Sequence, residues 1–210
     1  RTAPGSTFKP ISAIAGLTEK VITKEEEIED TGIFESIKPS PKCWVYPGKH
    51  GKINVTKAIE VSCNCFFFEV GYRLGTTSAG KISDEQGLNT LKKYASMFGL
   101  DKKSGIELSE IEPNFSTEDC VRSAIGQGSH SYAPIQLSRY VTALANGGDC
   151  FNLSIINKVT DSKDKLISEF AVSLLTKANV SDDIWDIVHE GMYQVVNGKD
   201  EGFDELYAKL

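Results

Sequence analysis

The chain has 210 residues, of which 40% are hydrophobic and 25% are charged, and its formal net charge at pH 7 is −6. This is ordinary globular composition, in a chain long enough for one domain with a sizeable core. The acidic balance, without any basic run, argues against a nucleic-acid-binding surface. No apolar stretch approaches the roughly 20 residues that a membrane span needs.

The first predicted element is a helix that follows the heptapeptide PGSTFKP at positions 4–10. Apolar residues recur at three- and four-residue steps from position 11 to 21, and Pro10 falls in the opening turn, where proline is tolerated best. Positions 29–52 carry three prolines and three glycines. We expect this stretch to be a loop with short hairpins.

A second helix is predicted from about residue 55 to 74. Asn54 or Thr56 could cap its first turn, and Gly75 closes it. The stretch is unusually aromatic, with three consecutive phenylalanines.

The rest of the chain predicts three further helices and one hairpin. One helix begins after Ser83, a capping candidate with Gln86 three residues later. Another runs between Pro134 and Gly147, which suit its two ends. Residues 155–170 alternate apolar and polar around a charged turn, which predicts a β-hairpin, and a last helix covers about 182–196. The chain is therefore expected to be helix-rich, with a few short strands.

The five cysteines do not predict a disulfide framework, because their number is odd and the chain is not small. Two of them form a C-x-C pair with no His-rich partner after it. We therefore expect buried or free thiols, no metal and no cofactor. The cysteines are Cys43, Cys63, Cys65, Cys120 and Cys150.

The heptapeptide PGSTFKP contains an S-x-x-K motif, Ser6 to Lys9. The same pattern at 78–81 and at 162–165 lies in polar stretches that read as solvated turns. Ser6 differs because it sits at a helix start, where unpaired N–H groups and the helix dipole favour a developing negative charge. Lys9 is one turn later on the same face and, if desolvated, could act as a base. The alternative is a simple helix N-cap.

Ser62-Cys63-Asn64 is the only S-x-N sequence in the chain. Its two polar residues lie in the aromatic helix, although Ser and Asn are poor helix formers. Such groups must be hydrogen-bonded or face a cavity. A locally bonded polar pair in a buried helix is the alternative to a functional site.

The order of these two motifs resembles that of the class B, monofunctional penicillin-binding transpeptidases. The resemblance runs nearly end to end and is greatest to the elongation-type proteins of Gram-positive anaerobes. It departs from the family at Ala133, where the family has a threonine. The matching stretches are PGSTFKP, CWVYPGKHGKINVTKAIEVSCNCFFFEVGYRLG, YASMFGLDKKSGIEL and IGQGSHSYAPIQLSRYVTALANGG.

The resemblance implies a role for each motif residue. Ser6 would be the acylated nucleophile and Lys9 the base that takes its proton. Ser62 would relay a proton between that lysine and the leaving amine, and Asn64 would bind the substrate's side-chain amide and help to hold Lys9. The loop at 126–128 would shape the domain near the site, and Cys63 is given no chemistry.

The family's third motif, K-[ST]-G, is missing. Lys103-Ser104-Gly105 matches the pattern but stands in a stretch that, in the family, is a loop away from the cleft. The true motif should follow the last helix, where this chain continues as KDEGFDELYAKL and ends at Leu210. The resemblance therefore implies a single partial domain over 1–210, the helical part of the penicillin-binding transpeptidase and serine β-lactamase-like α+β fold, with much of the central sheet missing.

The missing segments have two expected consequences. The opening helix should expose apolar surface where the sheet normally packs. The oxyanion hole should lack its second donor, a loss that typically reduces the rate by ~10²–10³. The intact parent should be acylated by β-lactams, and this chain alone should be weak or inactive.

The function implied is that of a peptidoglycan D,D-transpeptidase that forms a serine acyl-enzyme with D-Ala-D-Ala stem peptides. Its partners would be those stem peptides, β-lactam antibiotics and a membrane glycosyltransferase partner of the full-length protein, with no nucleic acid. It would work at the extracytoplasmic face of the bacterial cell membrane, anchored by a segment outside this sequence. Two alternatives are a serine β-lactamase or β-lactam sensor, and a non-catalytic helical scaffold or binding module.

Overall fold

The computed structural model describes residues 1–198. A short 3₁₀ helix, η1 (Gly5–Phe8), leads directly into the first α-helix. The α-helices are α1 (Lys9–Thr18), α2 (Val55–Glu60), α3 (Asn64–Gly75), α4 (Asp84–Met97), α5 (Cys120–Ser123), α6 (Pro134–Ala145) and α7 (Asp182–Asn197). The strands are β1 (Ile28–Asp30), β2 (Gly51–Ile53), β3 (Asp149–Phe151), β4 (Lys158–Thr160), β5 (Leu166–Glu169) and β6 (Leu174–Lys177).

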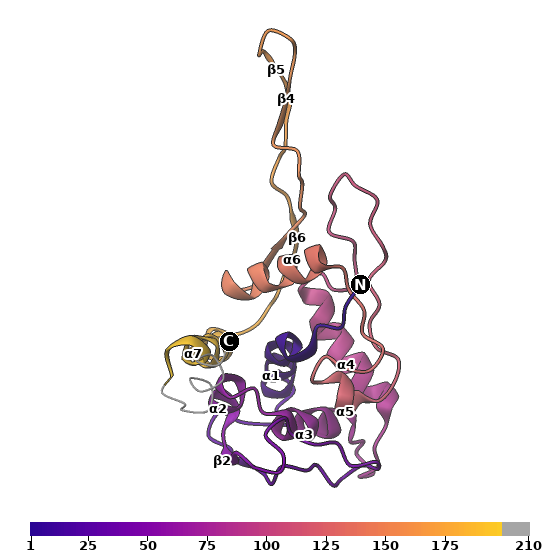
Figure 1. Ribbon diagram of the computed structural model, residues 1–210, viewed down its shortest axis with the longest axis vertical. Coiled ribbons are helices and arrows are strands. Elements are labelled where there is room, and N and C mark those ends of the chain that lie inside the picture. Colours follow the sequence, from indigo (N-terminus) through magenta and orange to yellow (C-terminus); the bar gives the residue numbers. More distant parts are fainter. Residues whose placement is uncertain (199–210) are drawn as a thin grey trace.

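Helix α1 lies at the centre of the body, with α2 and α7 on one side and α4 and α5 on the other (Figure 1). It packs against α2, α3, α4 and α7. Its apolar side chains Ile11 and Ile14, and Phe8 just before them, are completely buried. The expectation that the opening helix would expose an apolar face is therefore wrong for the described chain, because neighbouring helices surround it.

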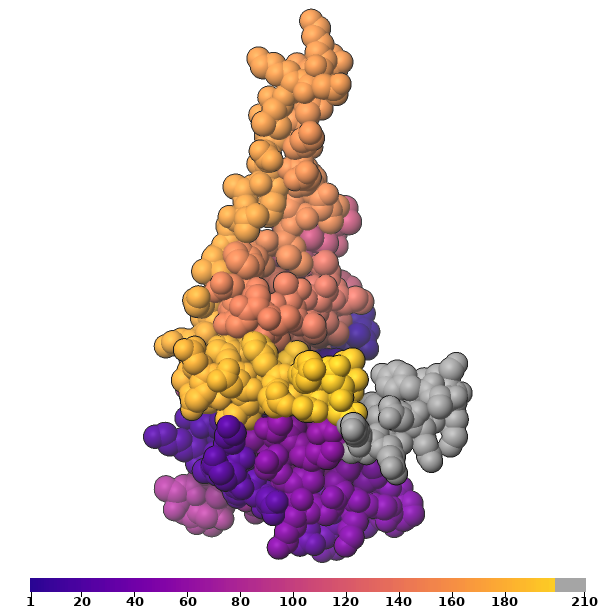
Figure 2. Space-filling model, turned by 90° about the vertical axis from the view of Figure 1, so that its left-hand side faces the viewer, coloured from indigo at the N-terminus to yellow at the C-terminus, as the bar shows by residue number. Residues whose placement is uncertain are grey.

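The described residues contain three separate two-stranded antiparallel sheets and no larger sheet. Strands β1 and β2 close the proline-rich loop as a short hairpin, with Asp30 opposite Gly51. Strands β4 and β5 form the predicted hairpin, which projects from the body as a narrow stalk (Figures 1 and 2). The fold class expected from the sequence, a helix-rich α+β arrangement, is confirmed.

Most helix predictions are confirmed with their caps. The Ser83 hydroxyl accepts a hydrogen bond from the Gln86 amide at the start of α4. Pro134 occupies the first turn of α6, and Gly147 follows that helix in the left-handed region, with a φ of +78°. The last helix appears as α7. No helix within residues 1–198 is long and apolar enough to cross a membrane. The chain's final stretch, KDEGFDELYAKL, begins at Lys199 and lies outside the described residues.

The predicted helix from 55 to 74 is wrong as a continuous element, because it is two helices with a break between Glu60 and Asn64. Ser62 adopts a left-handed backbone conformation, with a φ of +50°. Asn54 caps α2, as predicted, by accepting a hydrogen bond from an amide of the first turn. Cys63 caps α3, with its sulfur 3.4 Å from the amide nitrogen of Phe66. The second cap lets a new helix start where periodicity alone predicts continuation.

Candidate active site

Ser6 and Lys9 occupy the junction of η1 and α1. The Ser6 side chain is exposed, whereas Lys9 is only 2% exposed. The Lys9 Nζ lies 3.2 Å from the Ser6 Oγ. The tight 3₁₀ turn thus presents a hydroxyl to solvent and an amine, one turn later, to the interior.

The buried amine of Lys9 contacts all the other predicted site residues. Its Nζ lies 2.6 Å from the Ser62 carbonyl oxygen, 2.9 Å from the Ser62 Oγ and 2.7 Å from the Asn64 Oδ1. With the Ser6 Oγ, this makes four oxygen neighbours. The structure therefore brings together Ser6, Lys9, Ser62 and Asn64, which the sequence places on either side of a long loop.

The number of neighbours constrains the protonation of Lys9. An ammonium group has three donors and no acceptor, so it cannot donate to all four oxygens. A neutral amine donates to the two oxygens that can only accept, the Ser62 carbonyl and the Asn64 Oδ1. Its lone pair then accepts a hydroxyl proton from Ser6 or Ser62. The four oxygen neighbours can therefore be satisfied together by the neutral form of the amine.

Burial also favours the neutral amine. The pKa of Lys9 is lowered to about 8, mainly by desolvation, against an opposing effect of the nearby cysteines Cys63, Cys43 and Cys65. The ring of Phe67, itself fully buried, has its centre 5.9 Å from the Nζ. At pH 7 about a tenth of the lysines would then be neutral.

The break between α2 and α3 places Ser62 for this contact. In a continuous helix its carbonyl would bond to an amide four residues later. Here the left-handed turn releases that carbonyl, which lies against Lys9 instead. The neighbouring carbonyl of Val61 accepts a hydrogen bond of 3.0 Å from the indole of Trp44. No sequence pattern predicts the carbonyl contact, because the helical periodicity continues through the break.

The loop at 126–128 supports the segment that carries Ser6. Gly126 has a φ of +72°, and a Cβ there would lie 2.2 Å from the Gly5 carbonyl oxygen. The Gly5 amide donates a 3.1 Å hydrogen bond to the Gly126 carbonyl. Tyr140 of α6 adds a 2.6 Å bond from its hydroxyl to the carbonyl of Thr7. Gly126 and Tyr140 therefore hold the backbone on either side of Ser6 in place.

The other candidate residues lie apart from this site. The S-x-x-K sequences at 78–81 and 162–165 are in turns, as expected. The Ser104 hydroxyl of the rejected K-S-G sequence is buried and donates to Glu110. His130 is buried among aromatic rings, and desolvation lowers its pKa to about 4, so it is a neutral structural histidine.

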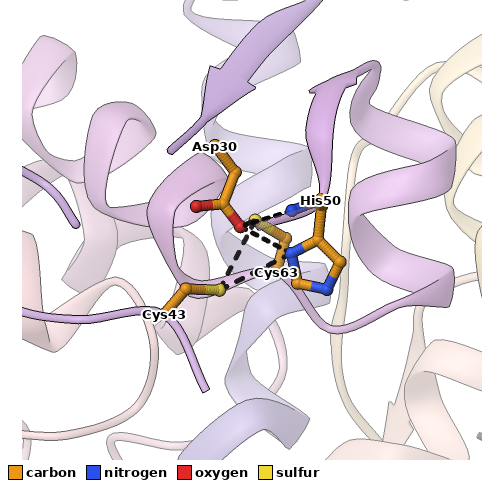
Figure 3. A group of neighbouring side chains, drawn as sticks. All are labelled: Asp30, Cys43, His50 and Cys63. Carbon is orange, nitrogen blue, oxygen red and sulfur yellow. Dashed lines mark hydrogen bonds and ion pairs between the residues drawn. The ribbon is translucent and has the colours of Figure 1, made fainter. Parts of the chain in front are cut away.

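A second cluster begins at Cys63, the middle residue of the S-x-N motif. Its sulfur lies close to the side chains of Asp30, Cys43 and His50, and this is the group within residues 1–198 that could hold a metal ion (Figure 3). The sequence analysis did not predict this cluster, because its members are far apart in the chain and the C-x-C pattern pairs Cys63 with Cys65 instead. The sequence interpretation also gave His50 no part in a site.

Comparison with known proteins shows which family the chain belongs to. The family model for the penicillin binding protein transpeptidase domain matches residues 1–209. Penicillin-binding protein 2B of Streptococcus pneumoniae is 26% identical over 213 residues, covering 93% of this chain and 31% of that protein. Peptidoglycan D,D-transpeptidase MrdA of Escherichia coli is 26% identical over 211 residues, covering 92% and 31%. The chain thus spans about a third of the length of these relatives.

Solved structures confirm the fold. Penicillin-binding protein 2B of Streptococcus pneumoniae strain 5204 superposes with a TM-score of 0.79 at 22% identity, covering 95% of this chain and 36% of that one. PBPA of Mycobacterium tuberculosis gives a TM-score of 0.77 at 20% identity, covering 93% and 44%. The resemblance inferred from the two motifs is confirmed: the chain belongs to the penicillin-binding protein transpeptidase domain family.

Proposed function

We propose that this chain carries the nucleophile and base of a class B peptidoglycan D,D-transpeptidase. The observation that carries the proposal is the contact set of Lys9, a buried amine with four oxygen neighbours that include Ser6 and both polar residues of the S-x-N motif. A lysine needed only for packing or a helix cap has no reason to be desolvated among hydroxyls.

In the proposed reaction, the Ser6 Oγ attacks the carbonyl carbon of the penultimate D-Ala of a stem peptide while Lys9 takes the hydroxyl proton. A C–O bond forms, and the C–N bond to the terminal D-Ala breaks. Ser62 relays the proton from Lys9 to the leaving nitrogen, so that D-Ala is released with a neutral amine. An amine of a neighbouring stem then attacks the ester, and Ser6 recovers its proton. β-Lactams would acylate the same oxygen.

Asn64 has two tasks in this proposal. Its Oδ1 accepts from Lys9 at 2.7 Å, which leaves its amide N–H₂ as a donor for the side-chain amide of the substrate. The oxyanion hole would be completed by a K-[ST]-G strand, and no such motif follows α7 in residues 1–210. Because one oxyanion donor is worth ~10²–10³ in rate, the chain by itself should acylate slowly.

The wider setting is part of the proposal. The full-length protein would act at the extracytoplasmic face of the cell membrane, anchored by a segment outside this sequence. A structure described as "Structural coordination of polymerization and crosslinking by a peptidoglycan synthase complex" matches this chain with a TM-score of 0.74 at 20% identity. This match supports a membrane glycosyltransferase as the partner of the full-length protein.

The test is intact-mass spectrometry of the chain after prolonged incubation with a penicillin. We expect one covalent adduct, absent in Ser6→Ala. The chain offers matched controls in Ser78→Ala and Ser162→Ala, which alter the other two S-x-x-K sequences and should leave the adduct in place. An adduct that persists in Ser6→Ala would refute the assignment. An adduct hydrolysed in seconds would favour a β-lactamase, and no adduct even after the downstream segment is restored would favour a scaffold.

A further inference from the structure

Helix α2 ends in a left-handed turn at Ser62, the residue that opens the S-x-N motif. The Cys63 amide donates to the Ala58 carbonyl at 3.0 Å, and the Ser62 amide donates to the Ile59 carbonyl at 3.1 Å. This pair of bonds is the Schellman pattern of a helix C-terminus, whose left-handed residue is usually glycine because a Cβ is strained there. Ser62 takes this place with a φ of +50°. Contacts from outside the helix must therefore offset the strain of the turn.

Two side chains from elsewhere in the chain hold the main chain of this turn. The Val61 carbonyl accepts a 3.0 Å hydrogen bond from the indole N–H of Trp44, and the Ser62 carbonyl lies 2.6 Å from the Lys9 Nζ. The Trp44 bond acts on the peptide group between Val61 and Ser62, whose N–H is bound to the Ile59 carbonyl. Because both its oxygen and its N–H are bonded, this peptide group cannot rotate without breaking a hydrogen bond. Its rotation is the motion that would change the φ of Ser62.

Trp44 lies in the proline-rich loop, outside the helices whose junction it contacts. Its side chain is 47% exposed, so burial in the core does not explain its position. Its ring lies against that of His50, with centroids 5.6 Å apart, whereas the Val61 that it binds is buried. An indole has one N–H donor and no acceptor. The half-exposed ring therefore makes one directional bond to a buried part of the main chain.

We propose that Trp44 is a positioning residue for the proton transfer assigned to Lys9, a role that rests on the proposed function. By fixing the peptide group between Val61 and Ser62, the indole keeps the turn left-handed. This conformation holds the Ser62 Oγ 2.9 Å and the Ser62 carbonyl oxygen 2.6 Å from the Lys9 Nζ. Trp44 touches none of the reacting atoms and acts only through Ser62.

Loss of the indole N–H should let this peptide group rotate and Ser62 relax to a negative φ. The Lys9 amine would then lose two of its four oxygen neighbours, including the hydroxyl that relays the proton in the proposed reaction. A displacement of about 1 Å at a catalytic group can reduce a rate by roughly 100-fold. We therefore expect the limiting rate of Ser6 acylation to fall by roughly 10- to 100-fold, with the affinity for the penicillin before acylation unchanged.

The first experiment removes only the hydrogen-bond donor. Replacement of Trp44 by 3-benzothienylalanine exchanges the indole N–H for sulfur in a ring of the same shape, and Trp44→Phe is a second variant without the donor. Acylation by a penicillin is followed by intact mass over a range of concentrations, which separates the limiting rate from the dissociation constant. Tyr46→Phe is the matched control, because it removes a donor from a similarly exposed aromatic residue of the same loop.

The limiting rate decides between positioning and stability. We expect both Trp44 variants to lose limiting rate with little change in the dissociation constant, and Tyr46→Phe to behave as the wild type. A wild-type limiting rate in the benzothienylalanine chain would overturn the proposal. A lower melting temperature with an unchanged limiting rate would also overturn it, because Trp44 would then contribute to stability alone.

An NMR measurement tests the turn without any reaction. The NOE between the amide proton and the Hα of the same residue is strongest at positive φ, so it reports the conformation of Ser62. We expect a strong NOE in the wild type and in Tyr46→Phe, and a weaker one with benzothienylalanine in place of Trp44. An unchanged NOE would overturn the proposal. If the NOE weakens but the wild type is not acylated even with the downstream segment restored, the proposed function fails by itself, while the control of the turn by Trp44 stands.

Discussion

The pH dependence of acylation is the sharpest test of the role given to Lys9. Its pKa is lowered to about 8, chiefly by burial. Only the neutral amine can take the Ser6 proton, so the rate should follow the neutral fraction. This fraction is about 0.01 at pH 6, about 0.1 at pH 7 and about 0.9 at pH 9. The rate should therefore rise roughly tenfold between pH 6 and 7 and level off above pH 8.

The matched perturbation is Asn64→Asp, which keeps the shape of the side chain and puts a negative charge where the Oδ1 now lies 2.7 Å from the Nζ. An opposite charge this close favours the ammonium form and raises a lysine pKa by roughly 1–3 units. The inflection of the profile should move to higher pH by this amount. At pH 7 the rate should fall by roughly 10- to 1,000-fold, and part of the loss should be recovered at pH 10.

The assay is single-turnover acylation by a penicillin, followed by intact mass at each pH. Slow acylation by the chain is acceptable, because the profile depends on ratios of rates. Titration of the Lys9 Nζ by ¹⁵N NMR gives the pKa independently of any reaction. A rate that is flat from pH 6 to 9, with Lys9 charged throughout, would refute the reasoning. So would an Asn64→Asp profile with an unchanged inflection.

Two further predictions concern stability and are read by urea unfolding. Gly126→Ala should lower the free energy of unfolding by about 3 kcal/mol or more, because the new Cβ would lie 2.2 Å from the Gly5 carbonyl oxygen in a left-handed turn. The control is Gly147→Ala, which is also left-handed but has nothing within 4 Å of the new Cβ, and it should lower that free energy by only about 1 kcal/mol. Equal effects would show that the contact with Gly5 is unimportant. Ile14→Ala should cost about 2–5 kcal/mol, since Ile14 is fully buried in α1, whereas Ile167→Ala in the β4–β5 hairpin, 64% exposed, should change stability by less than about 0.5 kcal/mol. A large effect at Ile167 would mean that the hairpin packs on something in solution.

The helices could be predicted because their signals are local. The periodicity of the residues after Pro10 and the Ser83 cap needed only a few neighbouring residues, and the structure agrees with both. The break at Ser62 could not be predicted in the same way. It depends on the contacts of Lys9 and Trp44, which are formed across the fold. It also depends on a local helix cap by the sulfur of Cys63, a residue type that is not among the usual caps.

The candidate site was predictable to the extent that its motifs are contiguous. Ser6 with Lys9 and Ser62 with Asn64 are short sequences, and the chain's family confirms the motif-based recognition. Their meeting at one amine is a tertiary contact that no spacing predicts. The cluster around Cys63 was missed for the same reason, because His50 and Asp30 approach each other only through the pairing of β1 with β2.

The β4–β5 hairpin has a consequence for cleavage of the chain. The hairpin projects from the body as a stalk (Figure 2). Its turn residues Lys163 and Lys165 are exposed, so trypsin should cut there first. The cut would leave α7 on a separate fragment. That helix buries Trp185 and Val188 and packs on α1 and α2, so the two fragments should remain associated. The hairpin is therefore a natural place to divide the chain into two complementing pieces, or to insert a label, without disturbing Lys9.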